Sequence, residues 1–277
     1  MPHADKGMSR QLDSIAELVA HLGHETLPAC LTRVLGDVTA FDGIVVFDYR
    51  RSDPPVDLYD DLDPTPREIT VTAYQAGAYL LDPFYHAHLN GVASGLYRLR
   101  DLAPGRFLRT AYYKTYYQRI GLIDELGFFA RVAEDRTIVV SIGRREPAAA
   151  FRQSELAGFR AVEPVIRAAV VQHWVRLVPS ASAETVPGSD RQEDSSGEFN
   201  PALAGLTERE TEVANLILRG YSSEAIGLTL DIRPSTVKVH RKHLYKKLQI
   251  SSQAELFALF LDSLSGIAYP QIDRPAR

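Results

Sequence analysis

The chain has 277 residues, of which 45% are hydrophobic and 24% charged, a composition typical of an ordinary globular protein with about two domains. Its formal net charge of −4 argues against indiscriminate nucleic-acid binding and restricts any DNA contact to a local, patterned surface. The single cysteine, Cys30, excludes an intramolecular disulfide and a cysteine-rich zinc site. No signal peptide follows Met1, and no apolar run approaches the roughly 18 residues of a membrane span, so we expect a cytoplasmic protein without a membrane partner.

The first elements in chain order are two helices and a strand. Apolar residues at helical spacing predict helices over residues 12–22 and 26–38, and residues 43–49 have the pattern of a strand. Thr65-Pro66-Arg67-Glu68 matches a capping box with proline in the first helical turn. The β-branched residues 69–72 that follow are compatible with helix or strand, and we favour helix.

The next elements are a helix, a hairpin and a long helix. Residues 109–120 have helical spacing, and residues 127–133 and 137–143 have the pattern of two strands joined by a short turn. Residues 153–175 carry apolar positions throughout and predict one long helix.

The predicted organisation is two domains joined by a linker. Helices before and after a small, largely antiparallel sheet indicate an α/β/α sandwich over residues 1–178, a sensory module of the PAS or GAF kind used for ligand sensing or dimerisation. Ser, Glu, Asp, Gly and Pro dominate residues 179–203, which predicts a flexible linker. Residues 204–265 predict an all-α four-helix domain, and residues 266–277 a C-terminal tail.

Local signals mark the ends of the four C-terminal helices. Thr207-Glu208-Arg209-Glu210 is a capping box, and Gly220 provides a stop for the same helix. Ser222 is a candidate N-cap of a short second helix, and Pro234 lies where the first turn of the third helix tolerates proline. Ser252 begins a similar cap pattern before the fourth helix.

The third of these helices is apolar on one side and basic on the other. At about 100° per residue, the inner stripe consists of Val237, Leu244 and Leu248. The opposite stripe consists of Lys238, Val239, Lys242 and Lys246. No acidic residue occurs from Ile232 to Ile250. A cationic outer stripe suits a DNA major groove, where lysines meet phosphates and base acceptors.

A family pattern spans the same segment. Its residues are Leu206-Thr207 with Arg209-Glu210, Gly220-x-Ser222, Ile226, Leu230, Ile232, Thr236-Val237-Lys238-x-His240 and Lys247-Leu248. In residue types and spacing, the segment resembles the C-terminal helix-turn-helix domain of LuxR/FixJ-type transcriptional regulators. The resemblance implies that Lys238, Val239 and Lys242 face base edges. It also makes Thr236, His240 and Lys246 candidates for phosphate or groove-rim contacts.

The segment departs from the family pattern at a few positions. Ala225 replaces a helix-capping carboxylate, and Arg233 replaces the common Ser or Thr cap of the recognition helix. Gly227 stands where the family carries alanine, which lowers helix propensity by up to about 1 kcal/mol. These changes predict a second helix that is slightly less stable and keeps its function.

The expected partner is double-stranded DNA. Two lysines on the groove are a modest number, so affinity should depend on pairing two domains of a homodimer across two half-sites. The apolar face of the fourth helix, including Phe257 and Leu261, is a candidate dimer seam, or it closes the core of the small domain. RNA polymerase is a further partner expected of such a regulator.

Aromatic residues gather in the N-terminal domain, where most of the thirteen tyrosines lie between Tyr74 and Tyr117. Aromatic walls with the carboxylates of Asp124 and Glu125 suit a small effector that is an amide-bearing lipid or a cationic amine. The alternative is that tyrosines at a spacing of three and four are core and rim residues of helices.

Asp82-Pro83 and Gly127 carry a second resemblance, to the autoinducer-binding domain of quorum-sensing LuxR regulators. The resemblance implies that the Asp82 carboxylate accepts a hydrogen bond from an acyl amide. The pocket tryptophans of that family are absent, because the single tryptophan is Trp174, in the terminal helix. The expected effector is therefore acyl-homoserine lactone-like or another amide or amine. The candidate ligand-binding residues are Asp82, Tyr74, Tyr85, Tyr97 and Phe128.

Other functions fit the sequence less well. A phosphoacceptor receiver domain needs an acidic pair after its first strand, but Asp60-Asp61 and Asp48 lie in a different order. No nucleophile elbow, phosphate-binding glycine loop or metal-ligand spacing is present, and His86 and His88 point to different sides of a helix. We therefore expect no catalytic residue, metal or cofactor. A ligand-independent regulator, controlled by dimerisation or a partner protein, remains the alternative.

Overall fold

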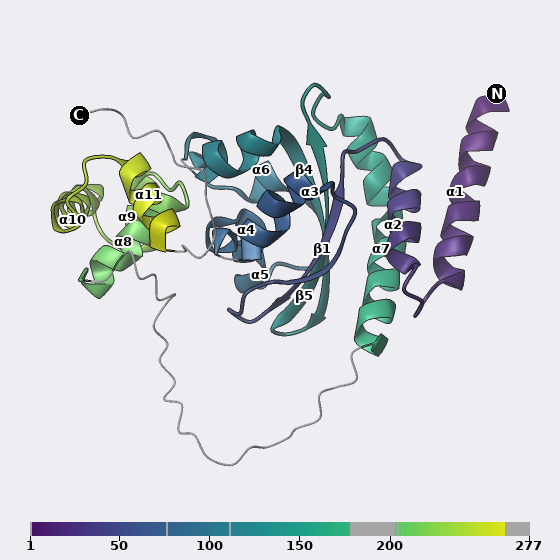
Figure 1. Ribbon diagram of the computed structural model, residues 1–277, viewed down its shortest axis with the longest axis horizontal. Helices are drawn as coiled ribbons and strands as arrows, with labels where there is room; N and C mark the ends of the chain where they lie inside the picture. Colours follow the sequence, from purple (N-terminus) through teal and green to yellow (C-terminus); the bar gives the residue numbers. More distant parts are fainter. Residues whose placement is uncertain (1, 76, 111, 178–202, 204, 264–277) are drawn as a thin grey trace, which may run out of the picture. The chain divides into compact units, whose positions relative to one another are not determined.

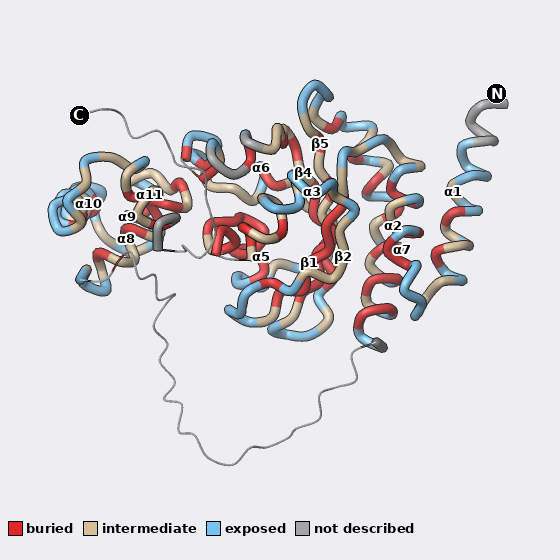
Figure 2. The backbone as a smooth tube through the Cα atoms, viewed as in Figure 1, coloured by how far each residue is buried: buried red, intermediate tan, exposed pale blue. Residues whose placement is uncertain are grey.

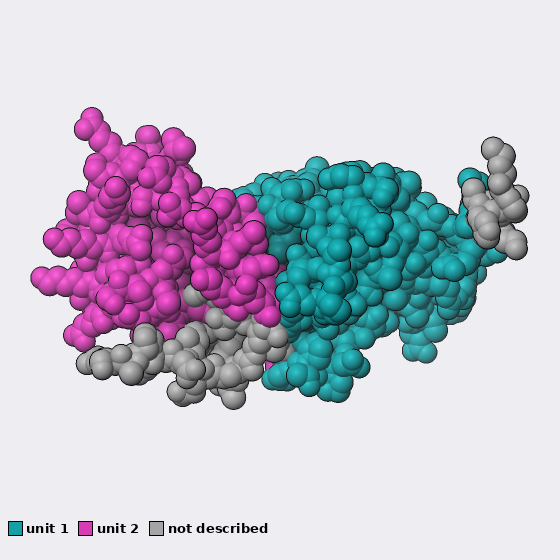
Figure 3. Space-filling model, turned by 90° about the horizontal axis from the view of Figure 1, so that it is seen from above, with its two compact units in different colours: residues 1–71, 83–102, 120–185 teal, residues 72–82, 103–119, 186–277 magenta. Residues whose placement is uncertain are grey.

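The computed structural model describes residues 2–75, 77–110, 112–177, 203 and 205–263 (Figure 1). The chain divides into two compact units, which Figure 3 colours separately. Unit 1 combines Met1–Val71, Pro83–Leu102 and Ile120–Thr185, and unit 2 combines Thr72–Asp82, Ala103–Arg119 and Val186–Arg277. The units therefore alternate along the chain in its first half. The predicted linker (except residue 203) and the predicted tail lie outside the described residues, and the predicted domain boundaries stay a prediction.

Unit 1 contains a five-stranded sheet in the order β2-β1-β5-β4-β3, and every adjacent pair is antiparallel. Its strands are β1 (Ile44–Arg50), β2 (Val56–Asp60), β3 (Gly95–Arg98), β4 (Leu122–Ala133) and β5 (Arg136–Arg145). The predicted strand over 43–49 and the predicted β4–β5 hairpin are confirmed. A receiver domain has a parallel sheet, so this topology contradicts the receiver alternative.

Helices of unit 1 lie on both faces of this sheet (Figure 1). On one side are α1 (Pro2–Ala20), α2 (Leu27–Gly36) and α7 (Gln153–Leu177). On the other side is α5 (Pro83–Leu89), and two short helices, α3 (Pro64–Arg67) and α6 (Leu99–Leu102), complete the unit. The prediction of a mixed α/β domain with an antiparallel sheet between helices is confirmed. Its assignment to the PAS or GAF kind stays a prediction.

One apolar core joins the sheet to α1, α2 and α7. Leu31 of α2, Phe128 of β4 and Phe159 of α7 are 0–2% exposed and belong to the same buried cluster, which also contains Trp174. The rings of Phe128 and Phe159 meet edge to face with centroids 6.0 Å apart. We name the sheet surface that carries Phe128 the core face.

The helix predicted to have its N-cap at Thr65 has it two residues earlier, at Asp63. Asp63 occupies the N-cap position with Pro64 in the first turn, and no side-chain capping bond forms. The prediction of a capping box at residues 65–68 is therefore wrong. The favoured helical conformation of the β-branched residues is observed, as a π-helix, η1 (Glu68–Thr72), followed by α4 (Ala73–Gln75) and the 3₁₀ turn η2 (Ala78–Leu81).

The regular helix predicted over residues 109–120 is instead three short helical pieces, η3 (Phe107–Arg109), η4 (Tyr113–Tyr117) and η5 (Gln118–Ile120). Thr110 explains the break, because its hydroxyl donates to the carbonyl of Phe107 at 2.7 Å and accepts the N–H of Tyr113 at 3.0 Å. Such local bonds compete with the α-helical ladder.

The C-terminal part of unit 2 folds into four helices: α8 (Glu208–Leu218), α9 (Ser223–Thr229), α10 (Pro234–Lys247) and α11 (Gln253–Ser263). The capping box at Thr207, the N-cap at Ser222 and the stop at Gly220, which has φ +92°, are all confirmed. Figure 2 colours the buried and exposed residues along these helices. Among the described residues, no helix has the length and apolar character needed to cross a bilayer.

Gly227 has a packing role in this domain. A Cβ at this position would lie 2.7 Å from the carbonyl oxygen of Ile232, whose own N–H donates to the carbonyl of Gly227 at 2.9 Å. The missing side chain therefore lets the α9–α10 turn close tightly. The departure from the family pattern at this position is compensated by tertiary packing.

Candidate functional site

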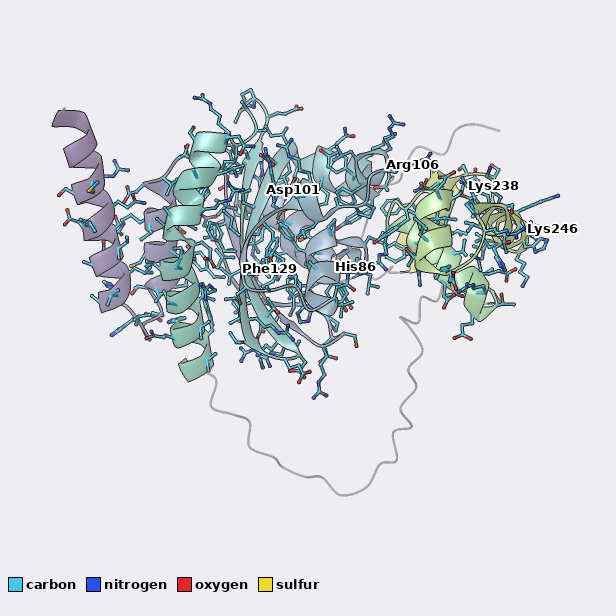
Figure 4. All side chains as sticks on the ribbon, turned by 180° about the vertical axis from the view of Figure 1, so that it is seen from behind. His86, Asp101, Arg106, Phe129, Lys238 and Lys246 are labelled. Carbon is cyan, nitrogen blue, oxygen red and sulfur yellow. The ribbon has the colours of Figure 1, made fainter. Side chains whose placement is uncertain are left out.

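The recognition helix α10 buries one side and exposes the other. Val237 and Leu244 are fully buried, whereas Lys238, Lys242 and Lys246 are exposed. Most of the α10 tube is pale blue in Figure 2, and Figure 4 labels Lys238 and Lys246 on the same helix. The orientation expected from the helical wheel is therefore observed.

The remaining predicted DNA contacts lie on the same surface. Thr236 is exposed and His240 is half-buried. Val239 is 49% exposed, although it is apolar, and it lies between two lysines of the cationic stripe. An exposed apolar side chain beside cations suits contact with a thymine methyl group in the major groove.

The position of α10 is fixed by a buried carboxylate of α8. Glu210 accepts the backbone N–H of Thr207 at 2.9 Å, completing the capping box, and pairs with Lys247 Nζ at 2.7 Å. The bond from Lys247, followed by the bonds from Thr207, lowers the pKa of Glu210 to about 2. One carboxylate therefore caps the first helix of the domain and ties the last turn of the recognition helix to it.

The lysines of the outer stripe are used differently from Lys247. Within the part of the chain that the structure describes, no carboxylate forms an ion pair with Lys238, Lys242 or Lys246. These charges are available to phosphates or base acceptors of a partner.

The fourth helix contributes buried aromatic residues to unit 2. Phe257 and Phe260 are each 2% exposed, and their rings stack with centroids 6.2 Å apart. Phe257 also meets the ring of Tyr112 at 6.3 Å. The side chain of Leu261 lies outside the described residues. Phe257 is therefore buried within unit 2, partly against a residue outside the predicted small domain, and the dimer seam stays a prediction.

The second candidate surface is the side of the sheet opposite the core face, which we name the aromatic face. It is formed by Phe47 and Tyr49 of β1, Tyr97 of β3 and Phe129 of β4, together with Phe84 and Tyr85 of α5. A Cβ at Gly127 would lie 3.0 Å from the ring of Phe84. Glycine at this position therefore lets the Phe84 ring approach the sheet closely.

Tyr85 and Tyr97 pack on different rings of the aromatic face. Tyr85 is fully buried, contacts Tyr49 at 5.9 Å and donates its hydroxyl to the carbonyl of Ser52 at 3.0 Å. Tyr97 is half-buried, contacts Phe129 at 5.2 Å and donates to the carbonyl of Ala93 at 3.0 Å. Both hydroxyls are thus already engaged by backbone carbonyls.

Phe128 lies on the opposite side of the sheet from Tyr85 and Tyr97. It packs on Phe159 in the core face, so the expectation that it shares a ligand surface with these tyrosines is corrected. The neighbouring Phe129 occupies the aromatic face. The two-residue period of a strand could have separated them, since Phe128 alternates with the apolar residues Leu126 and Ala130.

The other two candidate ligand residues belong to unit 2. Asp82 is 5% exposed, has an extended backbone and donates its N–H to the carbonyl of Tyr79 at 3.0 Å. Tyr74 is 2% exposed and meets the ring of Tyr79 edge to face. The five candidate residues are thus divided between the two units.

The carboxylate of Asp124 has a structural role. It receives two bonds from the guanidinium of Arg98 and the backbone N–H of Phe151 at 2.8 Å, and its side chain is 3% exposed. Its neighbour Glu125 accepts the hydroxyl of Ser141. The suggestion that Asp124 faces a cationic amine is therefore wrong, because Arg98 already neutralises it.

Among the residues that the structure describes, one group of side chains has potential metal-ligand atoms within 4.8 Å of one another: Glu17, His21 and Cys30. The bond from Arg33 lowers the pKa of Glu17, and burial raises the pKa of the Cys30 thiol. His21 Nδ1 lies 2.8 Å from the carbonyl oxygen of Glu17, to which it donates. A guanidinium beside the carboxylate and a disfavoured thiolate both oppose metal binding.

Comparison with known proteins agrees with the DNA-binding geometry. Residues 204–260 match the family model of bacterial regulatory proteins of the luxR family, GerE. The chain is 35% identical, over 197 residues, to an HTH-type transcriptional regulator in the exeN 3′ region of Aeromonas salmonicida, covering 70% of this chain and all of that protein. It is 30% identical to FixJ of Azorhizobium caulinodans, covering 47% of this chain and 59% of FixJ.

A solved structure shares the N-terminal fold. The LBD domain of VqsR from Pseudomonas aeruginosa superposes with a TM-score of 0.53 at 24% identity, covering 60% of this chain and 97% of that domain. Together with the capped helices and cationic outer stripe of α10, the luxR-family match and the 35% identical Aeromonas salmonicida regulator define a helix-turn-helix DNA-binding transcriptional regulator. The chain belongs to the LuxR family of bacterial regulatory proteins.

Proposed function

We propose that this regulator acts in the cytoplasm as a homodimer on two adjacent DNA half-sites, under the control of a small effector bound by its N-terminal domain. The effector is an acyl-homoserine lactone-like molecule or another amide or amine. The dimer acts on RNA polymerase at the promoter and carries out no catalysis itself.

The observation that carries the DNA-binding half of the proposal is the outer surface of α10. Lys238 and Lys242 are exposed one turn apart, with Val239 between them. Lysines reach guanine acceptors and phosphates, while an apolar side chain contacts a thymine methyl group. One such helix makes few contacts, so two copies on a dimer supply the affinity.

The aromatic face supports the effector half of the proposal. It combines large rings with the hydroxyls of Tyr97 and Ser141, which donate to the Ala93 carbonyl and to Glu125, and small-molecule sites use such a mixture of apolar and polar groups. The VqsR LBD domain has the same fold. In unit 2, taken by itself, Asp82 is the residue that we propose accepts a hydrogen bond from the effector, since it is 5% exposed.

The DNA-binding surface can be tested with a double variant, Lys238→Ala with Lys242→Ala. Each removed base or phosphate contact weakens binding by about 1–3 kcal/mol, so we expect specific binding to be lost in an anisotropy titration with promoter DNA. Both residues are exposed, so thermal unfolding should not change. The matched control is Lys114→Ala, which removes an exposed lysine outside α10. Unchanged affinity of the double variant would refute the assignment of this surface.

The effector can be sought by thermal unfolding of the full chain with acyl-homoserine lactones, small amines and aromatic acids. A ligand at about 100 times its dissociation constant stabilises the folded protein by roughly 2.7 kcal/mol. We expect one class to raise the melting temperature in the wild type and to lose this effect in Asp82→Asn, while Asp101→Asn, an exposed control, retains it. No shift with any class would favour the ligand-independent regulator.

A further inference from the structure

A cavity of about 200 Å³ in unit 2 is lined by arginines from two separate parts of the chain. Arg106 is the N-cap of the short helix η3 and Arg109 is its last residue, and Arg241 belongs to the recognition helix α10. Tyr221 and Ser223, at the start of α9, complete the polar wall.

Close backbone packing brings these arginines together. A Cβ at Gly220 would lie 2.7 Å from Thr110 Cγ2 and 3.0 Å from Phe107 Cα, and Gly220 has φ +92°. Phe107 and Thr110 are each 1% exposed. The α8–α9 turn therefore lies directly on η3 in unit 2, and the arginines on either side of Phe107 reach the rim of the cavity.

The cavity has an excess of positive charge. Three guanidinium groups line it and no carboxylate does. In the described ranges of the chain, no carboxylate forms an ion pair with Arg106, Arg109 or Arg241. Like charges gathered in this way repel one another, so an anion in the cavity would be stabilised.

Two residues near the cavity, Tyr245 and Glu224, do not supply that anion. Arg241 stacks over the ring of Tyr245, with its guanidinium carbon 5.1 Å from the ring centroid, which orients the charge without neutralising it. Glu224 is exposed; its own backbone N–H and the Ser222 hydroxyl are the largest causes that lower its pKa, and the charges of Arg106 and Lys238 contribute less. That carboxylate therefore belongs to the N-terminal cap of α9.

We propose that this cavity binds one phosphate group. Guanidinium groups present paired N–H donors that match phosphate oxygens, and the hydroxyls of Tyr221 and Ser223 provide neutral donors. A phosphate monoester carries a charge of about −1.5 to −2 near neutral pH, which three cations balance better than they balance a carboxylate. The volume of about 200 Å³ accommodates its five heavy atoms, because water occupies roughly 30 Å³ in the liquid.

The bound phosphate joins two parts of unit 2. Arg106 and Arg109 precede the sheet strand β4, whereas Arg241 lies on the DNA-reading helix. An anion held by all three attaches η3 to α10. This site is separate from the proposed effector site and does not depend on it.

The test is calorimetric titration of the full chain with inorganic phosphate, at constant ionic strength maintained with sodium chloride. We expect one saturable site in the wild type. We expect affinity at least about tenfold weaker in the double variant Arg106→Gln with Arg109→Gln, because the variant loses charge-assisted hydrogen bonds to the phosphate. Both arginines are exposed, so the fold should be retained. The matched control, Arg160→Gln, removes an exposed arginine from α7 and should bind phosphate like the wild type.

A second titration separates free phosphate from the phosphodiesters of DNA. If the occupant is a backbone phosphate, the double variant should lower the slope of log K against log salt for a duplex by about 0.9 per lost contact. If the occupant is a free phosphate, that slope should not change and only the calorimetric site is lost. The proposal is overturned if phosphate gives no saturable heat and the slope is unchanged, or if the double variant binds phosphate as tightly as the wild type.

Discussion

The sheet domain and the recognition helix use their charges in opposite ways. In unit 1, Arg98 and Arg136 have side chains 10% and 17% exposed, and each pairs with a buried aspartate. On α10, Lys238 and Lys242 are exposed without an ion-pair partner among the described residues. The first kind of charge is committed to the fold, and the second kind is available for a partner.

The difference follows from desolvation. A buried ion pair offsets its loss of hydration only when its hydrogen bonds are complete, so removing one partner leaves a charge that the interior cannot solvate. An exposed lysine keeps its water and gives up little when it is replaced. Substitutions in unit 1 should therefore change stability, while substitutions on the outer surface of α10 should change affinity.

The largest effect on stability is expected for Asp124→Ala. The change leaves Arg98 buried without its partner and the N–H of Phe151 without its acceptor, which should lower the free energy of unfolding by about 3–5 kcal/mol. Urea denaturation measures this loss. Asp101→Ala removes an exposed aspartate and should stay within about 0.5 kcal/mol of the wild type. A loss below about 1 kcal/mol for Asp124→Ala would contradict the structural role of the pair.

Two single substitutions on α10 should separate base reading from phosphate contact. Lys242→Ala should weaken binding to the target site by about 1–3 kcal/mol and relax its sequence preference. Lys246→Ala should weaken binding to all sequences alike and reduce the salt slope by about 1. Anisotropy titrations on target and scrambled duplexes at several salt concentrations measure both effects. Identical behaviour of the two variants would show that α10 does not lie in the groove as proposed.

The ends of the DNA-binding helices were predictable because their signals are local. Thr207 and Glu210 are three residues apart, and the side chains that form the cap are those the sequence shows. Gly220 likewise ends α8 with a left-handed conformation that glycine adopts readily. In both cases the residues that determine the end of the helix lie within one helical turn of that end in the sequence.

The rest of the fold depends on contacts between distant residues. The short strands β2 and β3 have five and four residues, too few for a clear period, and they are defined by their partners β1 and β4. Arg98 and Asp124 are 26 positions apart, so the sequence did not show that this carboxylate was already neutralised. The arginine cavity depends on η3 packing against the α8–α9 turn, which no sequence period encodes.

Glu210 combines features of both regions, because it is buried and yet belongs to the DNA-binding domain. Glu210→Gln should lower the free energy of unfolding by about 1–2 kcal/mol through the weakened cap and the lost bond to Lys247. Its pKa in the folded protein, about 2, is below the ordinary value of 4.5. Its contribution to stability is therefore present above about pH 4.5 and is lost as the pH falls toward 2.

Thermal unfolding between pH 7 and pH 3 checks this expectation. The variant should lose less stability than the wild type on acidification, since it lacks the titrating group. Glu208→Gln, an exposed neighbour in the same helical turn, is the matched control and should follow the wild-type curve. Parallel curves for wild type and Glu210→Gln would contradict the role of this carboxylate.

The smallest effect is expected at His88, a buried group of unit 1 that has no ion pair among the described residues. Its Nε2–H donates to the carbonyl of Arg51 at 3.1 Å, so its Nδ1 accepts the hydroxyl of Thr137 at 3.0 Å, and the ring stacks on Tyr49. Burial lowers its pKa from the ordinary 6.5, and the folded state therefore favours the neutral ring. Stability from this group is complete above pH 6.5 and is lost as the pH falls through the lowered value.

Denaturation of the wild type and His88→Gln between pH 7.5 and pH 5 tests this expectation. Glutamine keeps one donor and one acceptor but cannot be protonated, so the variant should show a shallower loss of stability on acidification. The His88→Gln variant should still lose some stability on acidification, because burial also lowers the pKa of His173, whose Nδ1 accepts the N–H of Gly23 at 3.2 Å. Replacement of both histidines should flatten the curve further, whereas His243→Gln, an exposed control on α10, should leave it unchanged. If His88→Gln followed the wild-type curve, the neutral, buried state of this ring would not contribute to the stability of the sheet domain.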